Sequence, residues 1–300
     1  MTAEYPQTRH NLGSKFRYAV FECMVRCRLV VFARFVLFFV VLYYTLLPQI
    51  RRRCAAYLAH RFPDAGPLQN IINAYRLYWT FGNILLDRMV AGISGRFLLH
   101  ATAPYAHHCL SEAGKNPQGC IILSAHVGAW QIGLAGLDQF DSPVNIVQMK
   151  TPDDPDKHYF ERGRGKPFHI IDASDPVGSL IEASAALKRG EIVCLMGDRL
   201  PANTPTHHCV KTPFLGGEIC LPLSAYALAS STGADLLMLF TVREKGFVTV
   251  WHVEHLDVPR GLSHRQPDAF RPYAVRFARA MEAVVKYYPY QFFNFYDMWV

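Results

Sequence analysis

Signatures of several common enzyme classes are missing from this sequence of 300 residues. There is no G-x-S-x-G elbow, which argues against a serine hydrolase of the α/β-hydrolase type. There is neither a Walker loop nor a G-x-G-x-x-G motif after a predicted strand, so nucleotide binding has no support. The eight cysteines include no C-x-x-C pair and several lie in apolar runs, which predicts reduced core residues in a cytosolic compartment.

A convincing metal-binding motif is also missing. The tripeptide His-His-Cys occurs at 107–109 and again at 207–209, but neither copy is accompanied by a second, suitably spaced pair of ligands. We therefore predict neither a metal site nor a bound cofactor.

The excess of positive charge is confined to the first 53 residues. This segment holds nine Lys or Arg and two Glu, so it accounts for the whole net charge of +7, and the rest of the chain is neutral. A nucleic-acid-binding domain would carry a basic stripe or patch on its folded surface, so we predict no nucleic-acid partner. A basic N-terminal segment instead favours contact with anionic lipid head groups.

A long apolar run lies in the same segment. Leu29 to Leu47 contains one charge, Arg34, and follows a stretch, 15–28, that mixes aromatic and basic residues as interfacial helices do. A helix that crosses a bilayer needs ~20 apolar residues, so this run is just long enough. Basic residues flank the run on both sides, so the charge pattern does not decide its location. The helix could span the bilayer, lie in one leaflet or be buried in the protein core.

The remaining residues are predicted to form one α/β domain, 54–300, behind an N-terminal membrane-anchoring helix within 1–53. The pattern is helical from 54 to about 96, and strands and helices alternate after Cys120. This succession predicts a mixed, mainly parallel central sheet flanked by helices. The strands are expected at 120–125, 144–149, 168–172, 192–196, 235–243 and 247–255, and the helices at 129–137, 177–188, 222–231 and 268–288.

His126 follows the first of these strands directly and precedes a predicted helix. The carboxyl ends of parallel strands are where ligands bind in open α/β sheets, and a histidine there can serve as a general base. A single histidine in an apolar setting can equally be structural. Asp198 and Arg199 end another strand at the same kind of edge, and the backbone N–H groups of Val127 and Gly128 are expected to stabilise an oxyanion.

Several blocks in their order along the chain resemble one family. SAHVGAWQ at 124–131 is followed by MGDR at 196–199, FLGGE at 214–218 and a Pro-Tyr-Gln-aromatic-Trp tail at 289–299. Together with the apolar N-terminal run and the length, they resemble the late lipid A acyltransferases, the lauroyl and myristoyl transferases of the glycerolipid acyltransferase superfamily. The resemblance covers nearly the whole chain, and none of the blocks is specific alone.

The resemblance implies a membrane-bound enzyme on the cytoplasmic side of the bacterial inner membrane. It would move an acyl chain from acyl carrier protein or acyl-CoA to a hydroxyl of a lipid A precursor or related glycolipid. The expected catalytic residues are His126, Gln131 and Asp198. The expected substrate-binding residues are Gly128, Trp130, Arg199, Phe214, Gly216 and Gly217.

Gln131 departs from the family pattern, which has an acidic residue at this position. A carboxylate would both fix the imidazole tautomer and stabilise the imidazolium, whereas a glutamine carbonyl can do only the first well. Three alternatives follow: Asp198 replaces the missing acid, the enzyme uses a weaker base, or the chain is a non-catalytic, membrane-anchored lipid-binding relative. Hydrolysis, with water as the acyl acceptor, is a further alternative.

Overall fold

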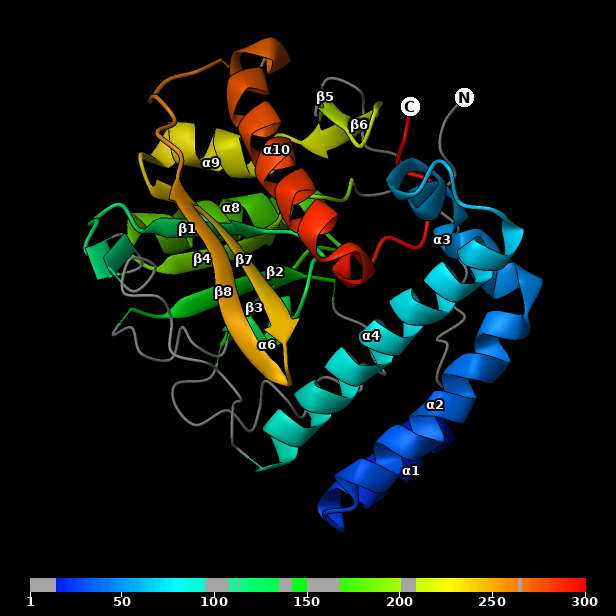
Figure 1. Cartoon of the computed structure of the whole chain (residues 1–300). Helices are drawn as coiled ribbons and strands as arrows, with labels where there is room; N and C mark the ends of the chain where they lie inside the picture. Colours follow the sequence, from blue (N-terminus) through cyan, green and yellow to red (C-terminus); the bar gives the residue numbers. More distant parts are fainter. Residues whose placement is uncertain are drawn as a thin grey trace.

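A computed structural model describes residues 15–94, 108–109, 111–112, 114–134, 142–149, 168–200, 209–263 and 266–300 (Figure 1). Three of the six residues in the two His-His-Cys tripeptides, 107, 207 and 208, and the last residues of the helix predicted at 129–137 lie outside this part of the chain.

A six-stranded sheet forms the centre of the molecule, in the order β3-β2-β4-β1-β7-β8. The first five strands in this order are parallel, and β8 is antiparallel to β7. The mixed, mainly parallel sheet is therefore confirmed. The strands are β1 (Cys120–Ser124), β2 (Val144–Gln148), β3 (His169–Asp172), β4 (Ile192–Met196), β7 (Asp235–Glu244) and β8 (Phe247–His255).

Helices cover both faces of this sheet, as predicted. Ile121 and Leu123 of β1 share one core with α8 (Pro176–Lys188), α9 (Ser224–Thr232) and α10 (Arg271–Tyr287). Ile122 points to the other side, because successive strand residues face opposite ways. There it joins a second core that includes Ala91 of α4 (Pro67–Ser94) and contacts Trp130 of α6 (Trp130–Leu134).

A separate hairpin, β5 (Cys209–Phe214) and β6 (Gly217–Pro222), adds two strands that are not among those expected from the sequence. Leu215 and Gly216 form the turn with φ angles of 46° and 77°. Two successive positive φ angles match the twist of the flanking strands, which is why such two-residue turns connect hairpins.

The N-terminal helices are α1 (Lys15–Arg26), α2 (Val30–Leu46) and α3 (Pro48–Arg61). Figure 1 shows α2 running alongside α4, which lies between α2 and the sheet. The helices approach closely at Gly82 of α4, where a Cβ atom would lie 2.9 Å from a methyl carbon of Leu37. One stripe of α2 is buried against α4, and its opposite face leaves large apolar side chains in solvent. The buried residues are Ala33, Leu37, Val41 and Thr45, and the exposed ones include Val31, Phe32, Phe35, Phe39 and Tyr43.

Taken singly, the helices of the described chain are each too short or too polar to cross a membrane. Only α2 and α3 together meet the length and composition expected of a span, and they are bent by 85°. The membrane-anchoring helix of the predicted fold is therefore unconfirmed. Arg34, the one charge of the apolar run, forms an ion pair of 2.8 Å with Asp87 of α4.

Candidate active site

His126 and Asp198 are brought together by the register of two neighbouring strands. Ser124 of β1 pairs with Met196 of β4. His126 and Asp198 each follow two residues after these paired positions. Gly197 continues the pairing by donating its N–H to the Ser124 carbonyl at 2.8 Å. A side chain at this position would collide with Leu123, since a Cβ atom would lie 2.6 Å from its methyl carbon. The strand ends therefore hold the imidazole and the carboxylate at one edge of the sheet.

The Nδ1 atom of His126 lies 2.9 Å and 3.1 Å from the two carboxylate oxygens of Asp198. A carboxylate only accepts hydrogen bonds, so Nδ1 carries the proton and Nε2 is left as the basic nitrogen. Burial lowers the pKa of His126 below its ordinary value, and this outweighs the opposing effect of Asp198. Burial alone would raise the pKa of Asp198, but the charge and hydrogen bond of His126, with Arg199, bring it below its ordinary value. The site therefore holds a neutral imidazole against an ionised carboxylate at neutral pH.

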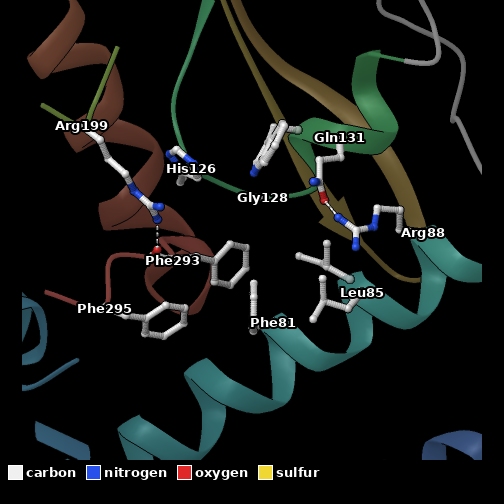
Figure 2. A pocket seen from close by; sticks show the side chains of 11 residues that line it. Phe81, Leu85, Arg88, His126, Gly128, Gln131, Arg199, Phe293 and Phe295 are labelled. Carbon is white, nitrogen blue, oxygen red and sulfur yellow. Dashed lines mark hydrogen bonds between the residues drawn. The ribbon is translucent and has the colours of Figure 1, made fainter. Parts of the chain in front are cut away.

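His126 lines a cavity of about 300 Å³ between the sheet edge, α4 and the C-terminal tail (Figure 2). α4 and the tail contribute mostly apolar side chains to the wall, and two guanidinium groups, Arg88 of α4 and Arg199, are also part of the lining. No carboxylate lines the cavity among the residues that the structure describes. The lining residues are Phe81, Ile84, Leu85, Arg88, His126, Gly128, Trp130, Gln131, Arg199, Phe293 and Phe295.

Gln131 lines the cavity but is directed toward Arg88, whose guanidinium donates to its amide oxygen (Figure 2). The partner of His126 Nδ1 is Asp198, from the end of β4. The tautomer of the imidazole is therefore set by Asp198 and not by the residue at the position of the family's acid.

Trp130 and Gly128 both line the cavity beside His126. The indole ring of Trp130 meets the imidazole edge to face, with ring centres 5.5 Å apart. Gly128 has a φ angle of 59°, and a Cβ atom there would lie 1.9 Å from the Thr241 carbonyl oxygen of β7. Only glycine therefore lets the chain pass directly over β7 at this point.

The oxyanion donors expected at Val127 and Gly128 are already engaged. The N–H of Val127 donates to the Ala125 carbonyl at 2.6 Å, and the N–H of Gly128 donates to the Gln291 carbonyl at 2.7 Å. That expectation is wrong, because the tail residue Gln291, distant in sequence, occupies the second donor.

Arg199 enters the cavity from the strand end that carries Asp198. One of its terminal nitrogens donates to the Phe293 carbonyl at 2.7 Å, and its guanidinium lies 6.0 Å from the ring centre of Tyr296. Its Nε atom is buried without a hydrogen-bond partner among the described residues. Arg199 thus retains donor capacity at the cavity.

The hairpin residues Phe214, Gly216 and Gly217 do not line the cavity among the described residues. The ring of Phe214 is fully buried and meets the tail residue Phe292 at 5.7 Å between ring centres. A Cβ atom at Gly217 would lie 2.4 Å from the ring of Trp299. The hairpin packs against the C-terminal tail, and direct substrate contact by these three residues stays a prediction.

The cavity wall includes residues that the sequence did not single out. Phe81, Leu85 and Arg88 come from α4, and Phe293 and Phe295 come from the tail. The available signals were the helical spacing of apolar residues between 54 and 96 and the density of aromatic residues after Pro289. Both signals are consistent with an apolar wall, but neither identifies Arg88.

A mainly parallel sheet with a histidine–carboxylate pair at its carboxyl edge, beside a largely apolar cavity with two guanidinium groups in its lining, is typical of an enzyme site in which a histidine can accept a proton. Residues 89–300 match the family described as bacterial lipid A biosynthesis acyltransferase, and the chain belongs to this family. It is therefore an acyltransferase of lipid A biosynthesis, and the resemblance drawn from its motifs is confirmed. No curated protein matches the chain.

Proposed function

We propose that this enzyme transfers a fatty acyl chain from a thioester to a hydroxyl of a lipid A precursor or related glycolipid, with His126 as general base. The observation that carries the proposal is the hydrogen-bonded pair of His126 and the buried Asp198, with His126 on the wall of a largely apolar cavity that also has two guanidinium groups in its lining. Asp198 supplies the carboxylate that Gln131 lacks, which favours catalysis over the non-catalytic alternative.

The proposed reaction needs no covalent enzyme intermediate. Nε2 of His126 takes the proton of the acceptor hydroxyl as its oxygen forms a bond to the thioester carbonyl carbon. The imidazolium is stabilised by Asp198 while the carbonyl oxygen carries the negative charge. The tetrahedral species collapses, the carbon–sulfur bond breaks, and the imidazolium returns its proton to the leaving thiolate.

Arg199 is the proposed cationic partner of the substrates. Arg199 lines the cavity together with His126, and its guanidinium can stabilise the developing oxyanion or bind a phosphate. In acyl carrier protein and coenzyme A the phosphate lies at the far end of the pantetheine arm from the thioester, whereas lipid A precursors carry phosphate on the sugar, so the acceptor offers the nearer phosphate partner for this charge.

The donor and the acceptor can be identified together in one assay. Detergent-solubilised enzyme is mixed with radiolabelled acyl-carrier-protein or acyl-CoA thioesters of several chain lengths and with total inner-membrane lipid. We expect label in a lipid A precursor or related glycolipid band with wild type and none with His126→Ala. Release of free fatty acid at the same rate without lipid would overturn the proposal and indicate hydrolysis.

We further propose that α2 lies flat in the cytoplasmic leaflet of the bacterial inner membrane. Its 17 residues span only about 25 Å as a helix, less than the ~30 Å of a hydrocarbon core. Its apolar outer face is flanked by basic residues at Arg28 and Arg51 to Arg53. If α2 crossed the bilayer, α4 beside it would carry the buried Asp87 and Arg88 into hydrocarbon, at high cost.

Two experiments test this placement. Phe35→Ser with Phe39→Ser should reduce flotation of the protein with anionic vesicles, whereas Phe247→Ser, which changes an exposed aromatic residue on the β7–β8 hairpin, should not. The exposed thiols Cys23 and Cys27, just before α2, report its topology. An impermeant maleimide should label them only from the cytoplasmic side, and labelling from the periplasmic side would contradict the flat placement.

A further inference from the structure

The C-terminal tail pairs with the segment that carries His126. The N–H of Phe293 donates to the His126 carbonyl at 2.9 Å, and the N–H of Gly128 donates to the Gln291 carbonyl at 2.7 Å. Val127 and Phe292 lie opposite each other in an antiparallel bridge between these bonds. Three tail residues thus act as a short strand along His126 to Gly128, within the segment that links β1 to α6.

The side chain of Gln291 fixes this pairing to the central sheet. Its amide oxygen accepts from the Arg243 N–H at 2.8 Å, and its amide nitrogen donates to the Arg243 carbonyl at 2.8 Å. β1 pairs with β7 only as far as Met238, so the edge of β7 at Arg243 has no β1 residue beside it. The backbone N–H and carbonyl of a strand need hydrogen-bond partners away from water. The Gln291 side chain, which is 6% exposed, supplies the acceptor and the donor for Arg243.

The His126 segment is therefore held between two surfaces. On one side Gly128 lies directly on the Thr241 carbonyl of β7, and on the other side its N–H is bonded to Gln291. Because the Gln291 side chain is itself bonded to β7 two residues further on, one residue joins the tail, the sheet and the catalytic segment.

Two further tail residues, Phe292 and Trp299, pack against α3 and the β5–β6 hairpin. The ring of Phe292 packs on Tyr57 of α3 and on Phe214, with ring centres 5.1 Å and 5.7 Å away. The indole N–H of Trp299 donates to the Phe214 carbonyl at 3.2 Å. The hairpin and α3 thus support the tail, and the tail supports the segment that carries His126.

We infer that Gln291 is a positioning residue for His126, which sets the distance of the imidazole from Asp198 and from the cavity. This inference rests on the proposed role of His126 as the base. Displacement of a reacting group by about 1 Å can cost about 100-fold in rate, so loss of both amide bonds should act on turnover more than on substrate binding.

The test compares Gln291→Met, which keeps the length but removes both bonds, with Asn145→Leu. Asn145 is a matched control, because it is also a buried amide bonded to a backbone carbonyl, that of Ile192 at 3.1 Å, near the amino-terminal edge of the sheet. Per folded molecule, Gln291→Met should lower kcat at least about tenfold and leave KM for the thioester within about twofold. Asn145→Leu should lower stability alone.

A second readout does not depend on activity. The pKa of His126 is measured by NMR with ¹³C-labelled histidine, and the resonance is assigned by its loss in His126→Ala. In Gln291→Met a loosened, better hydrated imidazole should have a pKa closer to ~6.5, because burial is the main cause of the lowering. Should Gln291→Met not fold, Gln291→Glu, which keeps only the acceptor half, serves for both readouts.

The inference is overturned if the folded variant keeps both the wild-type kcat and the wild-type pKa of His126, or if Asn145→Leu lowers kcat equally. If wild type itself transfers no acyl chain, the proposed function fails. A shifted pKa in Gln291→Met would then still show that Gln291 positions His126.

Discussion

The carboxylate of Asp198 can be neutralised with almost no change of shape by Asp198→Asn. In the wild-type enzyme the side chain is 2% exposed, and its oxygens lie 2.9 Å and 3.1 Å from Nδ1 of His126. Two unit charges about 4 Å apart at an effective dielectric constant of about 20 attract by about 4 kcal/mol. The imidazolium formed during proton transfer would lose this attraction, which corresponds to a rate about 10³-fold lower.

A second effect of this substitution acts in the same direction. An asparagine can donate a hydrogen bond to Nδ1, which favours the tautomer with the imidazole proton on Nε2 and removes the base from the cavity. We therefore expect the rate of acyl transfer to fall at least about 10³-fold, with the affinity for the thioester little changed.

The assay is single-turnover transfer of a labelled acyl chain, normalised to folded protein by circular dichroism. Asp235→Asn is the matched control, because Asp235 also faces a histidine, His255, at 3.3 Å, but outside the cavity. It should leave the rate unchanged. A rate for Asp198→Asn within about tenfold of wild type would refute the reasoning, since the buried carboxylate would then contribute little to the transition state.

Three further predictions concern the same site. Gln131→Glu should change the transfer rate less than about threefold, because the new carboxylate would pair with Arg88 and not with His126; a rate increase of tenfold or more would contradict this placement. Because the pKa of His126 lies below its ordinary value of ~6.5, the imidazole is neutral at pH ~7, so kcat/KM should be flat near neutrality and fall only at lower pH. A fall in kcat/KM centred above pH ~7 would contradict this prediction. Gly128→Ala should destabilise the fold by about 2–4 kcal/mol in denaturant titration, because its Cβ would meet the Thr241 carbonyl at a positive φ angle; a loss below about 0.5 kcal/mol would show that the backbone moves away freely.

The sheet and the His126–Asp198 pair were predictable because both depend on local patterns. β1 and β4 are short apolar runs that each end two residues before a polar side chain, and parallel strands end at a common edge. This argument places His126 and Asp198 near each other without any knowledge of packing. Their direct hydrogen bond depends on the one-to-one register of the two strands, which only the structure shows.

The rest of the site depends on contacts between distant parts of the chain. Arg88 sits in a helical stretch whose apolar spacing gave no reason to single out a charged residue, and it reaches Gln131 across 43 positions. The tail contacts the catalytic segment through backbone atoms, which leave no residue-type signal. The pairing of Gln291 with Gly128 therefore could not be expected, and neither could the occupation of the predicted oxyanion donors.

The role of the β5–β6 hairpin also depends on contacts between distant parts of the chain. Its motif, with Phe214 and two glycines, was predicted to bind substrate because it belongs to the family's blocks of residues. The structure places Phe214 and Gly217 against Phe292 and Trp299 of the tail. A family motif identifies residues that belong together, but packing decides whether they contact the substrate or support the residues that do.

The central claim is that His126 and Asp198 act as one unit in removing the hydroxyl proton, and a double-mutant cycle tests it most directly. Single-turnover transfer is measured for wild type, His126→Ala, Asp198→Asn and the double variant. Once the base is gone, the carboxylate has no imidazolium to stabilise, so the double variant should be about as slow as His126→Ala alone. Independent losses that multiply in the double variant, or near-normal transfer by His126→Ala, would contradict the account.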